Sequence, residues 1–245
     1  MIETKTVYFG GSGFRCAFYI GCMKALQERW PNQYPKKIHA DSAGSMIALG
    51  YALGVPWHRL EVIYYTCLKE QRRRGRLYLG EVNKDFNYII QEIVRQARRP
   101  LSEASFSVSI TYFPATNVLV PVTADNVHHV LLQSMYIPFV GRFQPVIDGA
   151  FTTSNMKYDV MFLANGSGGN GRNVVDIRPT FSMKSNKVIA LTPEDVGRYI
   201  EEGYRQTKRM QFAPPVPKED SGTAVVGLVW CMVFLHYLAT FFGIN

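Results

Sequence analysis

Ala40-Asp41-Ser42-Ala43-Gly44-Ser45 is the stretch that decides how the rest of the chain is interpreted. It follows a strand-like segment at 37–39 and opens a run of small apolar residues at 46–53, which is typical of a helix. A serine between small residues at such a corner has the form of a nucleophile elbow, G-x-S-x-G, with Ala40 in place of the first glycine. Ser42 or Ser45 as a simple helix cap would give the same pattern, so both interpretations stay open here.

A glycine-rich loop comes earlier, between a strand expected at 6–9 and a helix expected at 16–26. Backbone N–H groups at such a turn converge on one point and favour an anion. Gly10-Gly11-Ser12-Gly13 lacks the Gly-Lys-Ser/Thr of a phosphate-binding P-loop and the third glycine of a dinucleotide fingerprint. An oxyanion hole, which needs only two donors, and a plain glycine turn remain open.

Asp148 follows a short apolar strand at 145–147 and precedes Gly149. Taken alone, Asp-Gly is typical of a turn. The remaining pattern alternates helices and strands, which suits a single α/β domain in a chain of 245 residues. Further helices are expected at 56–70, 82–99, 124–135 and 192–210, and further strands at 106–112, 117–122 and 174–179.

Net charge and cysteine content indicate which molecules the protein is expected to bind. The net charge of +8 suits nucleic acid or an anionic membrane surface. The basic run at 72–76 lacks interleaved aromatic residues, so we interpret it as a solvated helix end and expect no nucleic acid. The cysteines, at 16, 22, 67 and 231, show no paired spacing, so the sequence predicts reduced thiols and no metal site. The N-terminus has no pattern of a secretory signal.

The last part of the chain differs in character. Residues 223–244 contain no formally charged residue and are long enough to span a bilayer as a helix. The Pro-rich segment 212–222 is predicted to be a linker that follows a domain at 1–211. The basic residues near the tail all precede it, which predicts a C-terminal membrane anchor with the domain in the cytosol. A buried C-terminal helix of the domain is the alternative.

The glycine-rich loop, the serine elbow and the Asp-Gly pair follow one another along the chain. In this order they resemble the patatin-like phospholipase family. The matching stretches are 10–15 for its glycine-rich loop, 40–44 for its G-x-S-x-G and 148–150 for its D-G-G/A. The flanking text at 137–139, 43–45 and 202–205 is similar to the adiponutrin-type branch, and the resemblance covers about residues 5–210. The chain departs from the family pattern at Ala40 and at Cys16, where the family often has glycine.

The resemblance implies a three-layer α/β/α fold with a central, mostly parallel sheet and a lipid acyl hydrolase without a cofactor or metal. It implies a Ser42–Asp148 dyad, an oxyanion hole at Gly11, Ser12 and Gly13, and Arg15 as a loop-orienting residue or a contact to a lipid phosphate. The elbow itself would comprise Ala40, Asp41, Ala43 and Gly44. The expected substrates are glycerolipids of a membrane or lipid droplet, cleaved as by a phospholipase A or lysophospholipase. The alternatives are a triacylglycerol lipase at lipid droplets and a catalytically silent, membrane-anchored scaffold.

Overall fold

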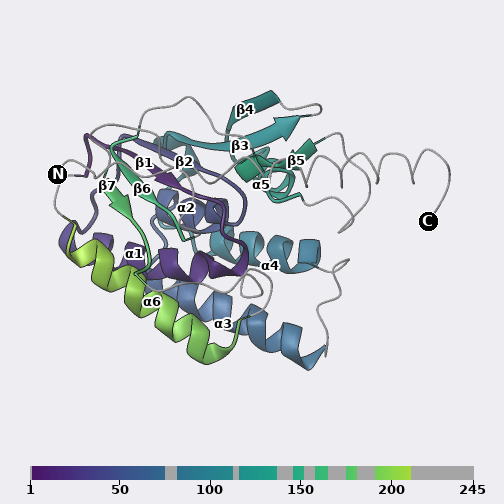
Figure 1. The fold of residues 1–245 in the computed structure, drawn as a ribbon. Helices are drawn as coiled ribbons and strands as arrows, with labels where there is room; N and C mark the ends of the chain where they lie inside the picture. The colour runs from purple at the N-terminus through teal and green to yellow at the C-terminus, as the bar shows by residue number, and fades with distance from the viewer. Residues whose placement is uncertain are drawn as a thin grey trace.

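A mostly parallel β-sheet forms the centre of the molecule (Figure 1). The computed structural model describes residues 2–74, 82–112, 116–136, 146–151, 158–164, 175–180 and 191–210. The strands of these ranges are β1 Thr6–Phe9, β2 Lys37–Ala40, β3 Phe106–Tyr112, β4 Thr116–Pro121, β5 Val146–Asp148, β6 Val160–Phe162 and β7 Val175–Ile177. The helices are α1 Ala17–Arg29, α2 Gly44–Ala52, α3 Trp57–Arg73, α4 Val82–Arg95, α5 Val127–Ser134 and α6 Pro193–Lys208.

The strands form one sheet in the order β4-β3-β2-β1-β6-β7, with β5 as a second partner of β3. β1 pairs in parallel with both β2 and β6, β2 with β3, and β6 with β7, whereas β4 and β5 run antiparallel to β3. A strand, a helix and a parallel strand, as in β1-α1-β2, form the βαβ unit that generates parallel sheets. The predicted α/β class with a mostly parallel sheet is therefore confirmed.

Most predicted elements are present, with three differences. β6 was not predicted, although it pairs directly with the central strand β1. The helix expected at 82–99 ends at Arg95, because the next turn leaves the helix and the N–H groups of Arg98 and Arg99 donate to the carbonyl of Leu53 at 2.9 and 3.2 Å. The helix expected at 124–135 begins only at Val127, after a turn in which Asn126 Oδ1 accepts the N–H of Thr123 at 2.8 Å.

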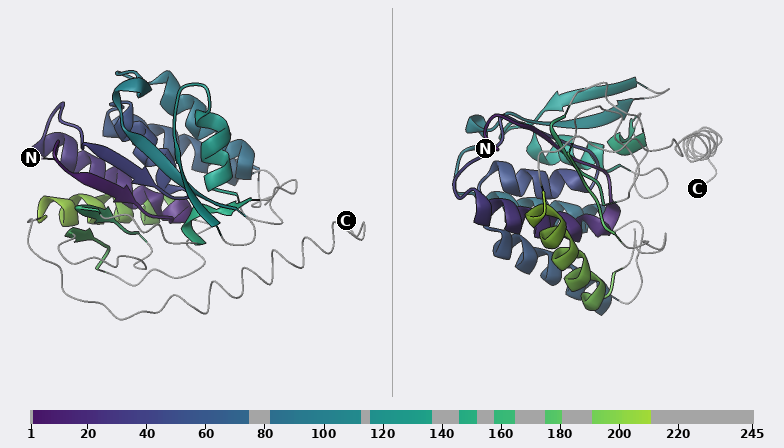
Figure 2. Two further views of the ribbon diagram at one scale, coloured as in Figure 1. Left: turned by 90° about the horizontal axis from the view of Figure 1, so that it is seen from above. Right: turned by 60° about the vertical axis from the view of Figure 1, so that its left-hand side comes forward.

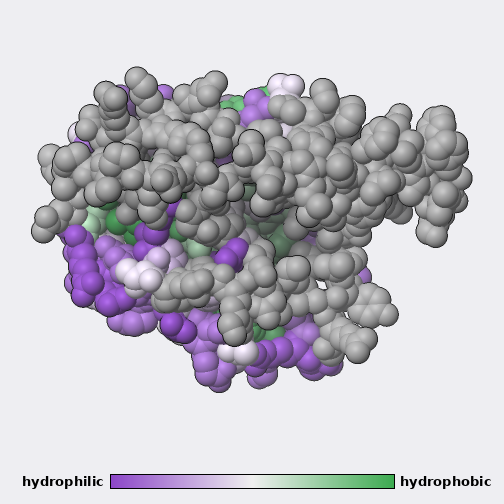
Figure 3. Space-filling model, in the orientation of Figure 1, coloured by the Kyte–Doolittle hydropathy of each residue, from purple (hydrophilic) through white to green (hydrophobic). Residues whose placement is uncertain are grey.

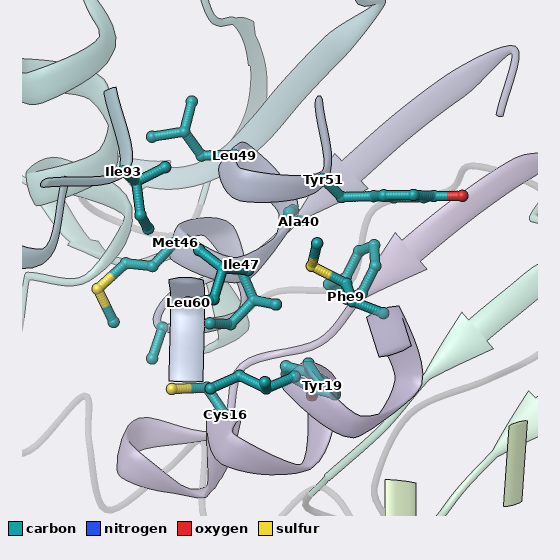
Figure 4. Close-up of a cluster of buried hydrophobic side chains, with 14 of the residues drawn as sticks. Phe9, Cys16, Tyr19, Ala40, Met46, Ile47, Leu49, Tyr51, Leu60 and Ile93 are labelled. Carbon is teal, nitrogen blue, oxygen red and sulfur yellow. The ribbon is translucent and has the colours of Figure 1, made fainter. Parts of the chain in front are cut away.

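The hydrophobic core lies between the sheet and the helices. α1, α2, α3, α4 and α6 lie on one side of the sheet (Figures 1 and 2), and α5 packs against β3, β5, α2 and α4. Figure 4 shows side chains from β1, α1, α2, α3 and α4 converging there, among them Phe9, Tyr19, Met46, Leu60 and Ile93. α2 is buried along its whole length, which explains its small and apolar composition.

The closest helix packing joins α1 to α6, which lie side by side in Figure 2. A Cβ at Gly21 would lie 1.8 Å from the carbonyl oxygen of Ile200, and one at Gly203 would lie 1.9 Å from that of Phe18. Only glycine permits this approach of two backbones. The start of α6 is held by a capping box: Thr192 Oγ1 accepts the N–H of Asp195, and the Asp195 carboxyl accepts the N–H of Thr192.

Hydrophilic side chains cover the outward side of α6 and the neighbouring part of α3 (Figure 3). No helix in the described ranges has the length and apolar composition needed to cross a bilayer. The predicted linker at 212–222 and the predicted membrane anchor at 223–244 lie outside the described residues.

The α1–α6 contact predicts a sharp difference between two glycines of α6. We expect Gly203→Ala to lower the free energy of unfolding by at least about 2 kcal/mol, because its Cβ overlaps the backbone of α1. Gly197→Ala is the matched control: its Cβ would meet only the Tyr65 hydroxyl, at 3.7 Å. That variant should be unchanged or more stable by up to about 1 kcal/mol. Urea denaturation measures both, and equal stabilities would contradict the packing described.

Candidate active site

Two strands that share one edge of β3 bring Ser42 and Asp148 together. β2 runs parallel to β3 and ends at Ala40, opposite Val108. β5 runs in the opposite direction along the same edge and ends at Asp148, opposite Ile110. The two strands therefore approach each other end to end at the level of Ser109. In the gap between them the Ser42 hydroxyl donates a hydrogen bond to Oδ2 of Asp148.

Gly149 allows this arrangement. A Cβ at this position would lie 2.0 Å from the carbonyl oxygen of Ser109, so a side chain would push Asp148 away from the strand edge. The Asp148 carboxyl is also fixed from its own turn, because the N–H of Ala150 donates to Oδ1 at 2.9 Å. The Asp-Gly pair thus makes the predicted turn and also presents the carboxyl to Ser42.

The elbow has the backbone geometry that its sequence suggested. Ser42 has a φ of 50°, a left-handed conformation that a serine rarely adopts and that costs about 1 kcal/mol. A Cβ at Gly44 would lie 2.4 Å from the carbonyl oxygen of Gly10, so α2 can start here only with a glycine. Ala40 is fully buried as the last residue of β2, and the smaller glycine of the family pattern is not required there. The Ser45 hydroxyl donates to the carbonyl of Ser42 at 2.5 Å, so Ser45 supports the first turn of α2 and does not reach Asp148.

Ser134, at the end of α5, is part of the site although the sequence did not indicate it. Its hydroxyl accepts the backbone N–H of Ser42 at 3.0 Å and donates to the carbonyl of Ser109 at 2.7 Å. Both groups are buried, and an unsatisfied buried N–H costs about 1–3 kcal/mol. Ser134 therefore holds the strained elbow against β3. A serine near the end of an amphipathic helix is too common a feature to reveal such a role.

The glycine loop lies directly against Ser42. A Cβ at Gly11 would lie 2.4 Å from the Cβ of Ala150 and 3.3 Å from the Cβ of Ser42, so the loop, the elbow and the Asp-Gly turn are in contact. Gly10 anchors the loop, because its N–H donates to Phe162 at 2.9 Å and its carbonyl accepts the Tyr19 hydroxyl at 2.7 Å. Within the described chain, the backbone N–H groups of Ser12 and Gly13 donate to no acceptor.

Arg15 follows the loop in the 3-10 turn Gly13–Cys16 and is only 8% exposed. Its Nε is buried without a hydrogen-bond partner, and burial lowers the pKa of the guanidinium. None of the hydrogen bonds made by Ser42 and Asp148 involves Arg15. The structure thus places a buried cation directly after the glycine loop.

Burial dominates the electrostatics of the site. Ser42 is 7% and Asp148 5% exposed. Loss of hydration raises the pKa of Asp148 to about 7, against the lowering effects of the hydrogen bonds from Ser42 and Ala150. The neighbouring carboxyl of Asp41, itself 4% exposed and with a pKa raised by burial to about 7, increases the shift further. No cluster of His, Cys, Asp and Glu among the described residues is arranged to hold a metal ion.

Comparison with known proteins gives weak structural likenesses. No protein-family model and no curated protein matches the chain. The type III effector ExoU is 13% identical with a TM-score of 0.47, over 84% of this chain and 52% of that one. VipD from Legionella pneumophila is 13% identical with a TM-score of 0.46, over 84% and 66%. The matched chain of the ExoU–SpcU complex from the type III secretion system of Pseudomonas aeruginosa is 11% identical with a TM-score of 0.43. This match covers 84% of this chain and 51% of that one.

The chain thus spans about half to two thirds of the chains that it matches. At TM-scores below 0.5, these likenesses assign neither a family nor an activity.

The buried carboxyl of Asp148 predicts a specific dependence of stability on pH. The folded chain keeps a proton on Asp148 up to about pH 7, whereas the unfolded chain releases it near the ordinary pKa of 3.8. Between these values the folded state binds more protons, so this group makes the fold less stable as the pH rises. Asp148→Asn cannot ionise, and its loss of stability between pH 5 and pH 8 should be smaller than that of the wild type by about 1 kcal/mol or more.

Urea denaturation at the two pH values measures this difference. Asp125→Asn is the control, because it removes a carboxyl that is exposed in the turn before α5. A pH dependence of Asp148→Asn equal to that of the wild type would show that burial does not raise the pKa of Asp148.

Proposed function

We propose that this protein is a serine hydrolase that cleaves the ester bonds of glycerolipids. The observation that supports the proposal most directly is the hydrogen bond from Ser42 to Asp148, at a left-handed elbow that lies against a glycine loop. A serine that only capped α2 would need neither the contact with Asp148 nor the strained backbone. Such strain costs stability, and it concentrates where function requires it.

In the proposed reaction Ser42 Oγ attacks the carbonyl carbon of the ester, and its proton passes to Asp148. The tetrahedral intermediate collapses with cleavage of the bond to the alkoxy oxygen, which takes the proton from Asp148 and leaves as an alcohol. The acyl group remains on Ser42. A water molecule then attacks the acyl carbonyl and gives a proton to Asp148. The bond from the acyl carbon to Ser42 Oγ breaks, Oγ takes the proton back from Asp148, and a fatty acid is released with Ser42 restored.

Asp148 suits the role of the base because of its surroundings. An aspartate in water has a pKa of about 3.9 and accepts a proton poorly from a hydroxyl. A pKa raised to about 7 brings it close to the range in which general bases work best at neutral pH. The N-terminal end of α2, directly after Ser42, adds the positive end of the helix dipole beside the developing negative charge.

The proposed oxyanion hole is the glycine loop. The N–H groups of Ser12 and Gly13 have no acceptor in the described chain, and Gly11 places the loop against Ser42. The N–H of Ser42 is occupied by Ser134 and is not a candidate donor. Loss of one oxyanion donor typically costs about 3 kcal/mol of transition-state stabilisation.

Phospholipids are the proposed substrate class. The resemblance of the glycine loop, the elbow and the Asp-Gly turn to the patatin-like family supports lipid esters. The unpartnered Nε of Arg15, beside the loop, favours a substrate with a phosphate over a neutral triacylglycerol. Hydrolysis of vesicle phospholipid and of emulsified triacylglycerol by the same preparation separates the two. Greater release of fatty acid from triacylglycerol would assign the protein as a neutral lipase.

The dyad predicts the response to a fluorophosphonate, which labels an activated serine with loss of fluoride. Ser42→Ala should abolish labelling and lipid hydrolysis, and Asp148→Asn should lower both at least about a hundredfold, because Asp148 no longer accepts the proton. Ser45→Ala is the matched control and should be labelled, because Ser45 only supports the first turn of α2. Labelling is followed by mass spectrometry. Modification of a serine other than Ser42, or full activity of Asp148→Asn, would refute the dyad.

We also propose that residues 223–244 anchor the protein to a membrane with its hydrolase domain in the cytosol. Their lack of charge supports this, and an anchor would hold the enzyme at the surface of an insoluble substrate. The full chain should sediment with membranes, whereas a chain that ends at Asp220 should stay in the supernatant. Sedimentation of the shortened chain to the same extent would contradict the anchor.

A further inference from the structure

Asp41 is a buried carboxyl that the proposed reaction does not use. It lies between the end of β2 and Ser42, and its backbone N–H donates to the carbonyl of Phe9 at 3.0 Å. Its side chain accepts a hydrogen bond from the hydroxyl of Tyr8, on the neighbouring strand β1. An elbow needs small residues, and Ala43 on the other side of Ser42 meets that need without a charge. A carboxyl at position 41 therefore has no explanation in the backbone geometry.

Burial of this carboxyl is costly. An acidic group that is 4% exposed loses most of its hydration, and proteins retain such groups where another interaction compensates. The compensating contact here is the Tyr8 hydroxyl, which stabilises the ionised form of Asp41. Tyr8 is held in turn by stacking on Tyr158, with the ring centroids 4.7 Å apart. The pair of Tyr8 and Asp41 is thus a fixed feature next to the serine.

The groups around the pair are neutral or acidic. Ser109 of β3 faces Asp41, Tyr19 of α1 and Tyr158 face Tyr8, and Asp41 and Asp148 of β5 face each other. His39 of β2 is the register partner of Tyr8 and contacts the ring of Tyr158. His39 is uncharged at neutral pH, because burial lowers its pKa to about 4. Among the described residues that shift the pKa of Asp41 or Asp148, none is a cation. A negative charge on Asp41 therefore acts on Asp148 without a neutralising partner.

We propose that Asp41, oriented by the Tyr8 hydroxyl, is a positioning residue that supplies a second negative charge beside Asp148 and so sets the pH range in which Ser42 is activated. This inference rests on the proposed function. The hydrogen bond from Tyr8 favours the ionised form of Asp41. Its charge then makes Asp148 hold a proton more tightly, which makes Asp148 a stronger base for the Ser42 hydroxyl. The two carboxyls titrate as a coupled pair.

Two substitutions test the two parts of the proposal separately. Asp41→Asn removes the charge and keeps an oxygen that accepts the Tyr8 hydroxyl. Tyr8→Phe keeps the carboxyl and removes only the hydroxyl that favours its ionisation. Asp125→Asn, at an exposed position, controls for the loss of one acidic charge from the whole molecule.

The measurement is the rate of fluorophosphonate labelling of Ser42 in the full chain between pH 5 and pH 9. The labelling rate should rise with pH as Asp148 ionises, and the midpoint of this rise is compared between variants. We expect the midpoint for Asp41→Asn to lie about one pH unit below that of the wild type, because Asp148 then ionises without a neighbouring charge. The midpoint of Tyr8→Phe should also move down, by no more than that of Asp41→Asn. Asp125→Asn should match the wild type.

A purely structural role of Asp41 would lower the labelling rate at every pH and leave the midpoint in place. If the wild type is labelled and Asp41→Asn has the same midpoint, this inference is therefore wrong, whereas the proposed hydrolase function is not contradicted. Absence of labelling in the wild type at every pH would overturn the proposed function, and with it the role of Asp41 in activating Ser42.

Discussion

The shared edge of β3 is the constraint on which the site depends. Two strands from distant parts of the sequence use the same row of backbone groups, one parallel and one antiparallel, and they stop just short of each other. The meeting of Ser42 and Asp148 follows from this pairing and needs no long side chain to reach across. It also explains why glycine is required at 149, where a Cβ would collide with the carbonyl of Ser109 on β3. Any change that moves either strand along β3 would separate the two groups, since a shift by one residue turns every side chain to the other face of the sheet.

The site lowers the stability of the domain that carries it. Ser42 has a left-handed backbone, and two carboxyls are buried close to it with pKa values raised to about 7. Each of these features makes the folded state less favourable near neutral pH. The surrounding structure compensates through the wholly buried helix α2, the close packing of α1 on α6, and the hydrogen bonds of Ser134 to both the elbow and β3. Local conformational preferences are violated at the site and obeyed around it, which is the usual distribution around functional or strained sites.

The sequence predicted the elements with strong local signals. The start of α6, with a proline and acidic residues in its first turn, the glycine loop after β1 and the alternation in β3 each have a physical cause within a few residues. β6 has only three residues and a continuous apolar pattern, which does not distinguish a buried strand from a segment of helix. The early end of α4 depends on the carbonyl of Leu53, a distant group that no local pattern reveals. The pairing of Ser42 with Asp148 was proposed only through a resemblance, and Ser134 and Tyr8 were missed, because their roles arise from tertiary contacts alone.

The interlocked glycines of α1 and α6 have a consequence for how the chain is made. α1 follows the first strand, whereas α6 is the last element of the described structure, so the first helix can complete its packing only after nearly the whole domain has been synthesised. Because α1 follows directly on the glycine loop, that loop would lack its final support while the chain is still attached to the ribosome. The support of the glycine loop therefore depends on the helix that is made last in the described part of the chain.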